Sequence, residues 1–309
     1  MLNLYWKAGE SIRALAARPF ASEDALERYI YANQELLGGD IYIIQRQIRT
    51  GTREGIPDMI GVDQDGRVCI IELKNTTADE SVLPQALGYA IWAETNPDSI
   101  KAIWLEARDR PEEMSIDWDN MDVRVILIAP GFRPTVSRMA VKIGYDIDLF
   151  QVQRYCLDDD EFILVELLEQ EPRSRVTMTR GKGEWDWDYY RSEYGQETTL
   201  QVKGTVEALD AFFCAQGWDL PHNLNKRYVG FKLENRLVAL VRWRGSSWSL
   251  QLRLPRSVTD DWEGTHWRFY HYNPKWKTAE FQPVKPDNAN IEEIKPLLQR
   301  AYDNVAGNT

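Results

Sequence analysis

Two carboxylates and one lysine have the types and spacing that metal-assisted hydrolysis requires. Asp58 ends the tetrapeptide Gly-Ile-Pro-Asp, and Glu72 and Lys74 lie two residues apart in a strand-like run. Alternate side chains of a strand emerge on the same face, so Glu72 and Lys74 point one way while Leu73 points into the core. Carboxylate oxygens bind hard divalent cations, and an ammonium can offset negative charge beside them.

The turn between the two strand-like runs predicts how these residues meet. A three-residue hairpin loop that ends with Gly66 in the left-handed conformation pairs Asp63 with Arg67. The same register places Asp58 opposite Glu72, with their Cβ atoms roughly 4.5 to 5.5 Å apart. Like charges at such positions are destabilising unless a cation lies between them. The hairpin therefore predicts a magnesium site.

The helix expected before this hairpin carries further acids. Ser22 is followed by Glu23 and Asp24, which is typical of a capped helix start with acidic residues in the first turn. Glu23 and Glu27 lie one turn apart on the same face, and the helix is expected to end near Gly38. Both glutamates are therefore candidates for the helical acid of the site.

A second helix is expected after the hairpin. Ser81 is predicted to cap it, and the helix should run to about Glu94. Gln85 and Tyr89 stand four residues apart on it and so share one face. Four elements thus direct polar groups towards one region.

The remaining patterns predict an α/β core followed by a smaller α+β domain. Strands are expected at 41–48, 56–62, 68–74, 102–105, 123–128, 147–152 and 162–167, with a helix at 135–143. Farther along, helices are expected at 184–194, 206–217 and 291–305, with three strand-like runs within 228–254.

These residues together resemble the PD-(D/E)XK nuclease superfamily. Glu23, Asp58, Glu72-x-Lys74 and Gln85-xxx-Tyr89, in this order, are similar to its RecB-like and NucS-like branch, which carries a QxxxY motif. The runs Phe20 to Leu37 and Val125 to Phe132 look like a bacterial group in which such a nuclease is joined to a C-terminal domain of unknown function. The resemblance implies a restriction-endonuclease-like core with a central mixed sheet flanked by helices.

The resemblance also implies a role for each residue. Asp58, Glu72 and the main-chain carbonyl of Leu73 would bind Mg²⁺, for which Mn²⁺ is expected to substitute. Lys74 would position or deprotonate the attacking water and offset charge on the scissile phosphate. Glu23 would be the helical acid, with Glu27 in reserve. The remaining pair, Gln85 and Tyr89, would contact the DNA backbone or steady the metal shell.

Charge divides the chain into two parts. Residues 1–171 hold 17 Lys and Arg against 31 Asp and Glu, a net charge of −14, whereas residues 172–309 hold 20 against 17, a net charge of +3. Eight of the twelve tryptophans also lie in the second part. We therefore predict a nuclease domain over 1–171, a linker with a helix over 172–199, and an α+β domain over 200–309 that binds substrate or another protein.

Cations and aromatic side chains alternate in the second part. Arg242, Arg244 and Trp248 are its candidate substrate contacts, because arginine suits phosphates and flat rings suit unpaired bases. The competing interpretation is structural, since tryptophans at strand positions are most often core residues and a net charge of +3 is small for a DNA-binding domain.

Other classes of protein are excluded by composition. With 43% apolar and 28% charged residues the chain is a globular protein, and no run is apolar enough to span a membrane. The three cysteines and three histidines form neither a zinc pattern nor a disulfide framework. We expect a cytoplasmic Mg²⁺-dependent deoxyribonuclease whose partner is DNA, with RNA not excluded, and a homodimer or a protein partner is possible through the second domain. The alternative is a catalytically silent nucleic-acid-binding or protein-interaction protein on the same fold.

Overall fold

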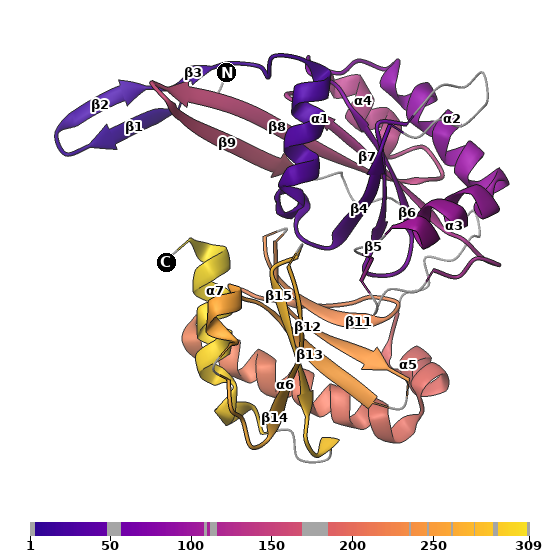
Figure 1. The fold of residues 1–309 in the computed structure, drawn as a ribbon, viewed down its shortest axis with the longest axis vertical. Coiled ribbons are helices and arrows are strands. Elements are labelled where there is room, and N and C mark those ends of the chain that lie inside the picture. Colours follow the sequence, from indigo (N-terminus) through magenta and orange to yellow (C-terminus); the bar gives the residue numbers. More distant parts are fainter. Residues whose placement is uncertain are drawn as a thin grey trace. The chain divides into compact units, whose positions relative to one another are not determined.

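The computed structural model describes residues 4–47, 57–107, 110–111, 116–168, 185–234, 236–245, 247–260, 262–274, 276–286 and 290–307. The chain forms two compact units (Figure 1). The first unit comprises residues 1–36 and 41–179, and the second unit comprises residues 37–40 and 180–309. Residues 55 and 56 of the predicted motif and residues 172–184 of the predicted linker lie outside the described residues. The domain boundaries at 171 and 199 stay predictions.

A seven-stranded mixed sheet forms the centre of the first unit. The central strands β6, β7 and β8 are parallel to one another, and the other neighbours pair antiparallel. The order is β3-β8-β7-β6-β5-β4, with β9 also paired to β8. The strands are β3 (Ala16–Ala17), β4 (Ile41–Arg46), β5 (Met59–Asp63), β6 (Val68–Leu73), β7 (Val123–Ala129), β8 (Asp146–Leu157) and β9 (Asp160–Leu167).

Helices flank this sheet. Both α1 and α2 pack against β6, and α3 packs against β4. The helices of the first unit are α1 (Glu23–Ala32), α2 (Val82–Thr95), α3 (Pro97–Glu106) and α4 (Pro134–Ala140), and a 3₁₀ turn, η1 (Gln34–Leu37), follows α1. A short hairpin of β1 (Tyr5–Ala8) and β2 (Ser11–Ala14), which the sequence did not predict, precedes them.

The predicted hairpin register is confirmed. Met59 pairs with Ile71 and Val62 pairs with Val68, as the three-residue loop requires. Gly66 has a φ of 80° and donates its N–H to the carbonyl of Asp63. Glycine is the residue that adopts this left-handed conformation without a steric cost, so the turn fixes the pairing of β5 with β6.

Some predicted helix details are corrected. The Ser22 hydroxyl accepts the N–H of Ala25 at 3.0 Å, as a helix cap should, but α1 ends at Ala32, before Gly38. At α2 the expected cap is wrong, because the Ser81 hydroxyl donates to Asp79 and makes no capping bond.

The strand expected at 102–105 is also wrong, since these residues lie in α3. Pro97 stands in the first turn of this helix, where its fixed φ suits a helix start. Ile100 and Trp104 are buried, and four residues separate them, which is the spacing of one helix face.

The second unit is α+β. A six-stranded antiparallel sheet has the order β10-β11-β12-β13-β15-β14. Its strands are β10 (His222–Leu224), β11 (Tyr228–Leu233), β12 (Arg236–Arg244), β13 (Ser247–Arg253), β14 (Trp267–Asn273) and β15 (Thr278–Pro283). The helices are α5 (Trp187–Tyr194), α6 (Gln196–Gln216) and α7 (Lys295–Ala306), with 3₁₀ turns η2 (Arg256–Val258) and η4 (Ile291–Glu293). The sequence predicted β11, β12 and β13 but missed the other three strands.

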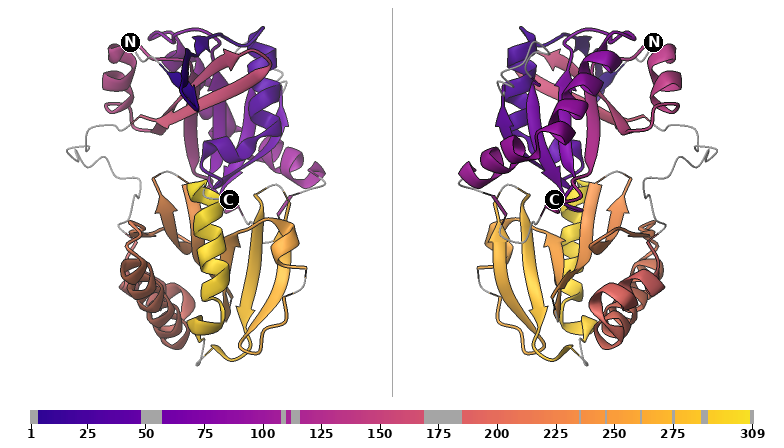
Figure 2. Two further views of the ribbon diagram at one scale, coloured as in Figure 1. Left: turned by 90° about the vertical axis from the view of Figure 1, so that its left-hand side faces the viewer. Right: turned by 90° about the vertical axis from the view of Figure 1, so that its right-hand side faces the viewer.

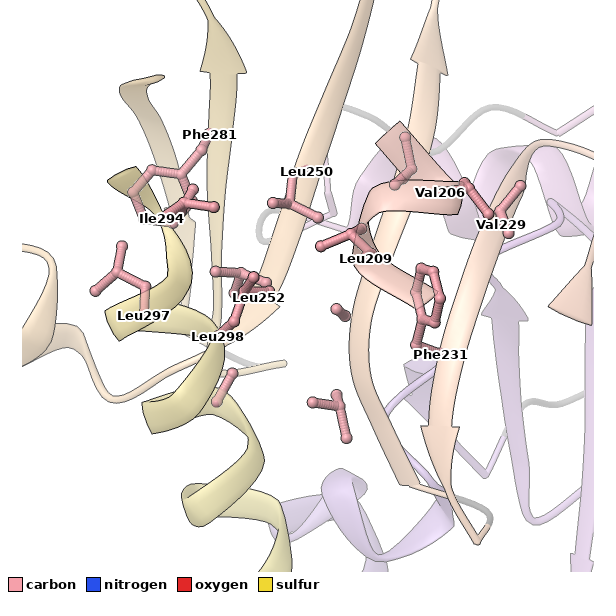
Figure 3. Close-up of a cluster of buried hydrophobic side chains, with 14 of the residues drawn as sticks. Val206, Leu209, Val229, Phe231, Leu250, Leu252, Phe281, Ile294, Leu297 and Leu298 are labelled. Carbon is pink, nitrogen blue, oxygen red and sulfur yellow. The ribbon is translucent and has the colours of Figure 1, made fainter. Parts of the chain in front are cut away.

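The core of the second unit lies between this sheet and its helices (Figure 2). Figure 3 shows Leu298 of α7 beside Leu252 of β13, and Leu209 of α6 near Leu250 of the same strand. The predicted fold class, a mixed sheet flanked by helices followed by a smaller α+β domain, is confirmed. Within the described residues, no helix has the length and apolar character needed to cross a membrane.

Candidate active site

Asp58 and Glu72 meet at one end of the β5–β6 hairpin. Asp58 directly precedes β5, and Glu72 is the penultimate residue of β6. The Asp58 carboxylate accepts the main-chain N–H of Leu73 through Oδ2 at 2.7 Å. Glu72 is buried, with 1% of its surface exposed. The register therefore holds two carboxylates side by side and largely away from water.

Lys74 places an ammonium between acids from two elements. Its Nζ lies 2.6 Å from Oε1 of Glu72 and 3.7 Å from Oε1 of Glu23, at the start of α1. The main-chain N–H of Lys74 donates to the carbonyl of Ile128 at 2.8 Å, which continues the pairing of β6 with β7. Sheet pairing thus fixes the backbone of the lysine next to the acids.

Burial and mutual repulsion make both carboxylates weak acids. Burial raises the pKa of Glu72 from 4.5 to about 8, and the charge of Asp58 adds to the rise. Burial likewise raises the pKa of Asp58 from 3.8 to about 6, although the N–H of Leu73 opposes the shift. Burial alone would lower the pKa of the Lys74 ammonium, but the surrounding carboxylates, led by Glu72, raise it above 10.5. The one ammonium of Lys74 is therefore too little positive charge to keep both carboxylates ionised at neutral pH.

The donor set fits a hard divalent cation. Oε2 of Glu72 is buried and finds no hydrogen-bond partner within the described part of the chain. A buried carboxylate oxygen without a partner is costly, and a cation would satisfy it. No group of three or more His, Cys, Asp or Glu side chains poised for a metal exists among the described residues. Asp58 and Glu72 supply two carboxylates here, and the third predicted ligand, the main-chain carbonyl of Leu73, stays a prediction.

The two candidate helical acids have different surroundings. Glu27 is buried and accepts hydrogen bonds from Nε of Arg46 at 2.7 Å and from Nε2 of Gln47 at 3.2 Å. Glu23 is partly exposed and lies beside Lys74. Because Arg46 already neutralises Glu27, Glu23 is the better placed of the two to act with the lysine.

Asn75 also belongs to the site, although no motif in the sequence marks it. Its main-chain N–H donates to Oε2 of Glu23 at 3.4 Å, and its side-chain Nδ2 donates to the carbonyl of Phe20 at 2.8 Å. These bonds tie the start of α1 to the end of β6. The only sequence signal was its position directly after Lys74.

Gln85 and Tyr89 lie on α2, which packs against β6. Nε2 of Gln85 donates to the Tyr89 hydroxyl at 3.3 Å. Gln85 is exposed whereas Tyr89 is buried. The predicted pairing on one helix face is therefore present, and their contact with DNA stays a prediction.

The three residues of the second unit that were predicted to contact substrate already make contacts with other side chains of that unit. Trp248 is fully buried, donates from Nε1 to Gln201 at 3.3 Å and meets Trp267 edge to face. In this position it is a core residue whose faces are not open to a base. Arg242 is buried over the ring of Tyr228, and Arg244 forms an ion pair with Glu280.

Comparison with known proteins finds a sequence relative of this chain. No protein-family model matches the chain. Endonuclease NucS of Aeropyrum pernix is 30% identical over 128 residues, which cover 41% of this chain and 39% of that protein. The chain thus spans about two fifths of the length of this relative.

Among solved structures, a repair endonuclease from Pyrococcus abyssi is 26% identical with a TM-score of 0.29, over 43% of this chain and 48% of that one. An EndoMS–dsDNA complex is 18% identical with a TM-score of 0.31, over 48% of this chain and 64% of that one. The sequence match confirms the resemblance to NucS that the residues indicated, while the QxxxY motif and the identity of the second domain stay predictions.

Proposed function

We propose that this chain is a metal-dependent endonuclease that hydrolyses DNA phosphodiester bonds with its first unit. The observation that carries the proposal is the convergence of Asp58, Glu72 and Lys74, with a buried oxygen on Glu72 that no described residue pairs. Carboxylic acids with shifted pKa values next to a lysine ammonium are typical of catalytic sites. Sequence similarity to an endonuclease supports the same reaction.

In the proposed site, Asp58, Glu72 and the main-chain carbonyl of Leu73 would hold Mg²⁺, with Mn²⁺ as a substitute. When bound, the cation would polarise a phosphoryl oxygen and lower the pKa of a bound water. The two carboxylates would then lose their protons, because a cation favours the ionised form of a ligand. Metal affinity should therefore rise with pH up to about pH 8, where the metal-free Glu72 ionises.

Lys74 acts as an ammonium in this proposal. Its raised pKa keeps it protonated at neutral pH, so it donates hydrogen bonds and offsets charge rather than accepting a proton from water. Glu23 holds the ammonium from the side of α1, at 3.7 Å. Asn75 in turn donates to Glu23 and is a positioning residue. The chain therefore supplies orientation and charge around the reacting phosphate.

The decisive experiment is a cleavage assay with the full chain. Supercoiled, linear, branched, mismatched and single-stranded DNA should be incubated with Mg²⁺, with Mn²⁺ and with EDTA. We expect cleavage that needs the metal and disappears in Asp58→Asn. Asp159→Asn is the matched control, because it removes an exposed carboxylate from the β8–β9 turn of the same unit. Equal cleavage by the wild type and Asp58→Asn would refute the assignment.

The non-cleaving alternative makes a different prediction. A protein that only binds nucleic acid or protein would have no need of a metal at Asp58 and Glu72. Calorimetric titration with Mn²⁺ distinguishes the two cases, since metal uptake by the wild type but not by Asp58→Asn supports a nuclease site. No uptake by either protein would favour the non-cleaving alternative.

A further inference from the structure

One exposed surface of the first unit is basic, although the first part of the chain is strongly acidic. Residues 130–144 contain three cations, Arg133, Arg138 and Lys142, and no Asp or Glu. The remaining 14 of the 17 Lys and Arg in residues 1–171 stand against all 31 Asp and Glu of that part. The three cations belong to α4 and the loops at its two ends, and we call them the α4 basic strip.

Folding turns the α4 basic strip towards solvent. Val136 and Ala140 lie four residues apart on α4 and are buried, so they mark the face with which this helix packs on the unit. All three cations of the strip are exposed. The cations therefore lie where a partner can reach them without any opening of the fold.

The strip also differs from other arginines of the first unit in its ion pairs. Arg138 and Lys142 form no ion pair with any acid in the described part of the chain. Arg133 lies 3.9 Å from Oε2 of Glu80, and 61% of its side chain is exposed. Six other arginines of the unit each pair with an acid at closer range, namely Arg13, Arg28, Arg46, Arg67, Arg124 and Arg154. The positive charge of the strip is thus largely left for a negatively charged partner.

Backbone pairing connects the start of the strip with the candidate active site. The main-chain N–H of Lys74 donates to the carbonyl of Ile128, and pairing between the same two segments resumes at Ala78, whose N–H donates to Gly131 at 2.9 Å. The N–H of Arg133 in turn donates to the carbonyl of Ala78 at 3.0 Å. Four residues separate Lys74 from Ala78, so their Cα atoms are at most about 14 Å apart. In Figure 1, α4 lies at the end of the first unit at which α1 begins.

We propose that the α4 basic strip binds the sugar–phosphate backbone of double-stranded DNA beside the bond that is cut. The proposal rests on the proposed nuclease function and extends it, because it names duplex DNA as the substrate class. Duplex DNA carries one negative charge for about every 1.7 Å of its axis. A duplex whose scissile phosphate lies at Lys74 therefore brings several further phosphates to the distance at which the strip begins.

The composition of the strip favours a duplex over a single strand. Proteins that bind single strands stack unpaired bases on aromatic side chains, and residues 133–142 contain no Phe, Trp or Tyr. Cations alone contact phosphates, and such contacts position a duplex without reading its sequence. The strip should therefore bind duplexes of any sequence, with an affinity that falls steeply as the salt concentration rises.

The test is a binding measurement on the full chain in EDTA, so that neither metal nor cleavage is needed. Fluorescence anisotropy with a labelled 20-base-pair duplex, at salt concentrations from 50 to 200 mM, gives the slope of log K against log[salt]. The variant Arg133→Gln/Arg138→Gln/Lys142→Gln should bind the duplex at least tenfold more weakly. Its slope should be smaller by about 2.7, because each lost phosphate contact removes about 0.9.

Single substitutions separate a local contact from total charge. Lys142→Gln should lower the slope by about 0.9, and Lys142→Arg should keep it, since a phosphate contact needs only the charge. Lys101→Gln is the matched control, because it removes one exposed lysine of the same unit from α3, which packs against β4 and not against β7. It should leave the slope unchanged. Circular dichroism and the Tm verify that each variant is folded.

Several results would overturn the proposal. They are no binding of the duplex by the wild type, an unchanged slope in the folded triple variant, equal losses in Lys142→Gln and Lys101→Gln, or tighter binding of a single strand than of the duplex. Failure of the nuclease assignment would show itself differently. Asp58→Asn should bind the duplex in EDTA like the wild type, and the triple variant should take up Mn²⁺ like the wild type, so the two assays report on separate residues.

Discussion

Replacing Glu72 by glutamine should stabilise the metal-free protein while it abolishes metal binding. Glu72 is buried at the end of β6, and its pKa is raised from 4.5 to about 8. The folded protein therefore keeps the proton up to about pH 8, whereas the unfolded chain releases it near pH 4.5. Because the folded state binds more protons in this window, its stability falls as the pH rises from 4.5 to 8. Glutamine resembles the protonated acid and removes this dependence.

The magnitude follows from the pKa difference. At pH 7 the unfolded Glu72 is about 2.5 pH units above its pKa, and each unit corresponds to about 1.4 kcal/mol. The free energy of unfolding of Glu72→Gln should therefore exceed that of the wild type by up to about 3 kcal/mol at pH 7. The gain should vanish near pH 4, where both states of the wild type are protonated at Glu72.

Thermal unfolding of the full chain in EDTA, followed by calorimetry at several pH values, measures this difference. Addition of Mn²⁺ should raise the Tm of the wild type and leave that of Glu72→Gln unchanged, because a ligand stabilises only a protein that binds it. The wild type should also gain more from Mn²⁺ at pH 8 than at pH 6, since protons compete with the metal for Glu72.

Glu27→Gln is the matched control. Glu27 is also a buried glutamate of the first unit, but each of its carboxylate oxygens accepts a hydrogen bond, one from Arg46 and one from Gln47. The same substitution should therefore lower the Tm there, since it leaves Arg46 without one charged partner. If Glu72→Gln were as destabilising as Glu27→Gln in EDTA, Glu72 would be a structural ion-pair residue and not the metal ligand proposed here.

Three further outcomes are expected. Lys74→Ala should lose cleavage yet keep calorimetric Mn²⁺ binding, because lysine is not a metal ligand, and joint loss of both would contradict the division of roles. Gly61→Ala should lower the Tm by several degrees, since its Cβ would stand 2.8 Å from the carbonyl oxygen of Tyr42, and an unchanged Tm would show that the strands can shift. Burial alone would raise the pKa of Glu293, but hydrogen bonds from Thr265 and the next two main-chain N–H groups lower it to about 2. Glu293→Gln should therefore cost about 1 to 2 kcal/mol at pH 7 in urea unfolding and less near pH 3, and an equal loss at both pH values would contradict this assignment.

The site hairpin could be predicted from sequence because its determinants are local. Asp63 accepts the main-chain N–H groups of Asp65 and Arg67 through Oδ1, at 3.0 Å each, and Gly66 closes the turn. These contacts span four residues, so the turn sequence encodes them. Once the turn fixes the register, the position of Asp58 opposite Glu72 follows without any knowledge of the rest of the fold.

The choice between the two helical acids could not be made in this way. It depends on Arg46, which comes from β4 and lies 19 residues after Glu27 in the chain. Helical periodicity places Glu23 and Glu27 on one face but does not show which of them a distant strand neutralises. The strand wrongly expected at 102–105 has a similar origin, because a short apolar run fits a buried strand or a helix face equally well.

Arginine and tryptophan alternate along β12 and β13. Such an alternation of residue types along a strand does not by itself indicate whether the side chains bind a substrate or fill the core. One set of positions, which includes Trp243 and Trp248, fills the apolar core, and the other set, which includes Arg242 and Arg244, lines the opposite face. The pattern therefore arises from a sheet with one apolar and one polar face. It can be explained without any contact between the tryptophans and a substrate.

The charge balance of the site connects the acidic first part of the chain with its proposed chemistry. Glu23, Asp58 and Glu72 surround the single ammonium of Lys74, so full ionisation would leave an excess of negative charge in a largely buried place. A phosphodiester brings more negative charge, and the metal-free site would repel it. The protein relieves the excess by keeping protons on its carboxylates up to pH values of about 6 and 8. In the proposed function, a divalent cation would relieve it in another way, by replacing those protons and restoring attraction for the phosphate, so metal binding and substrate binding should favour each other at this site.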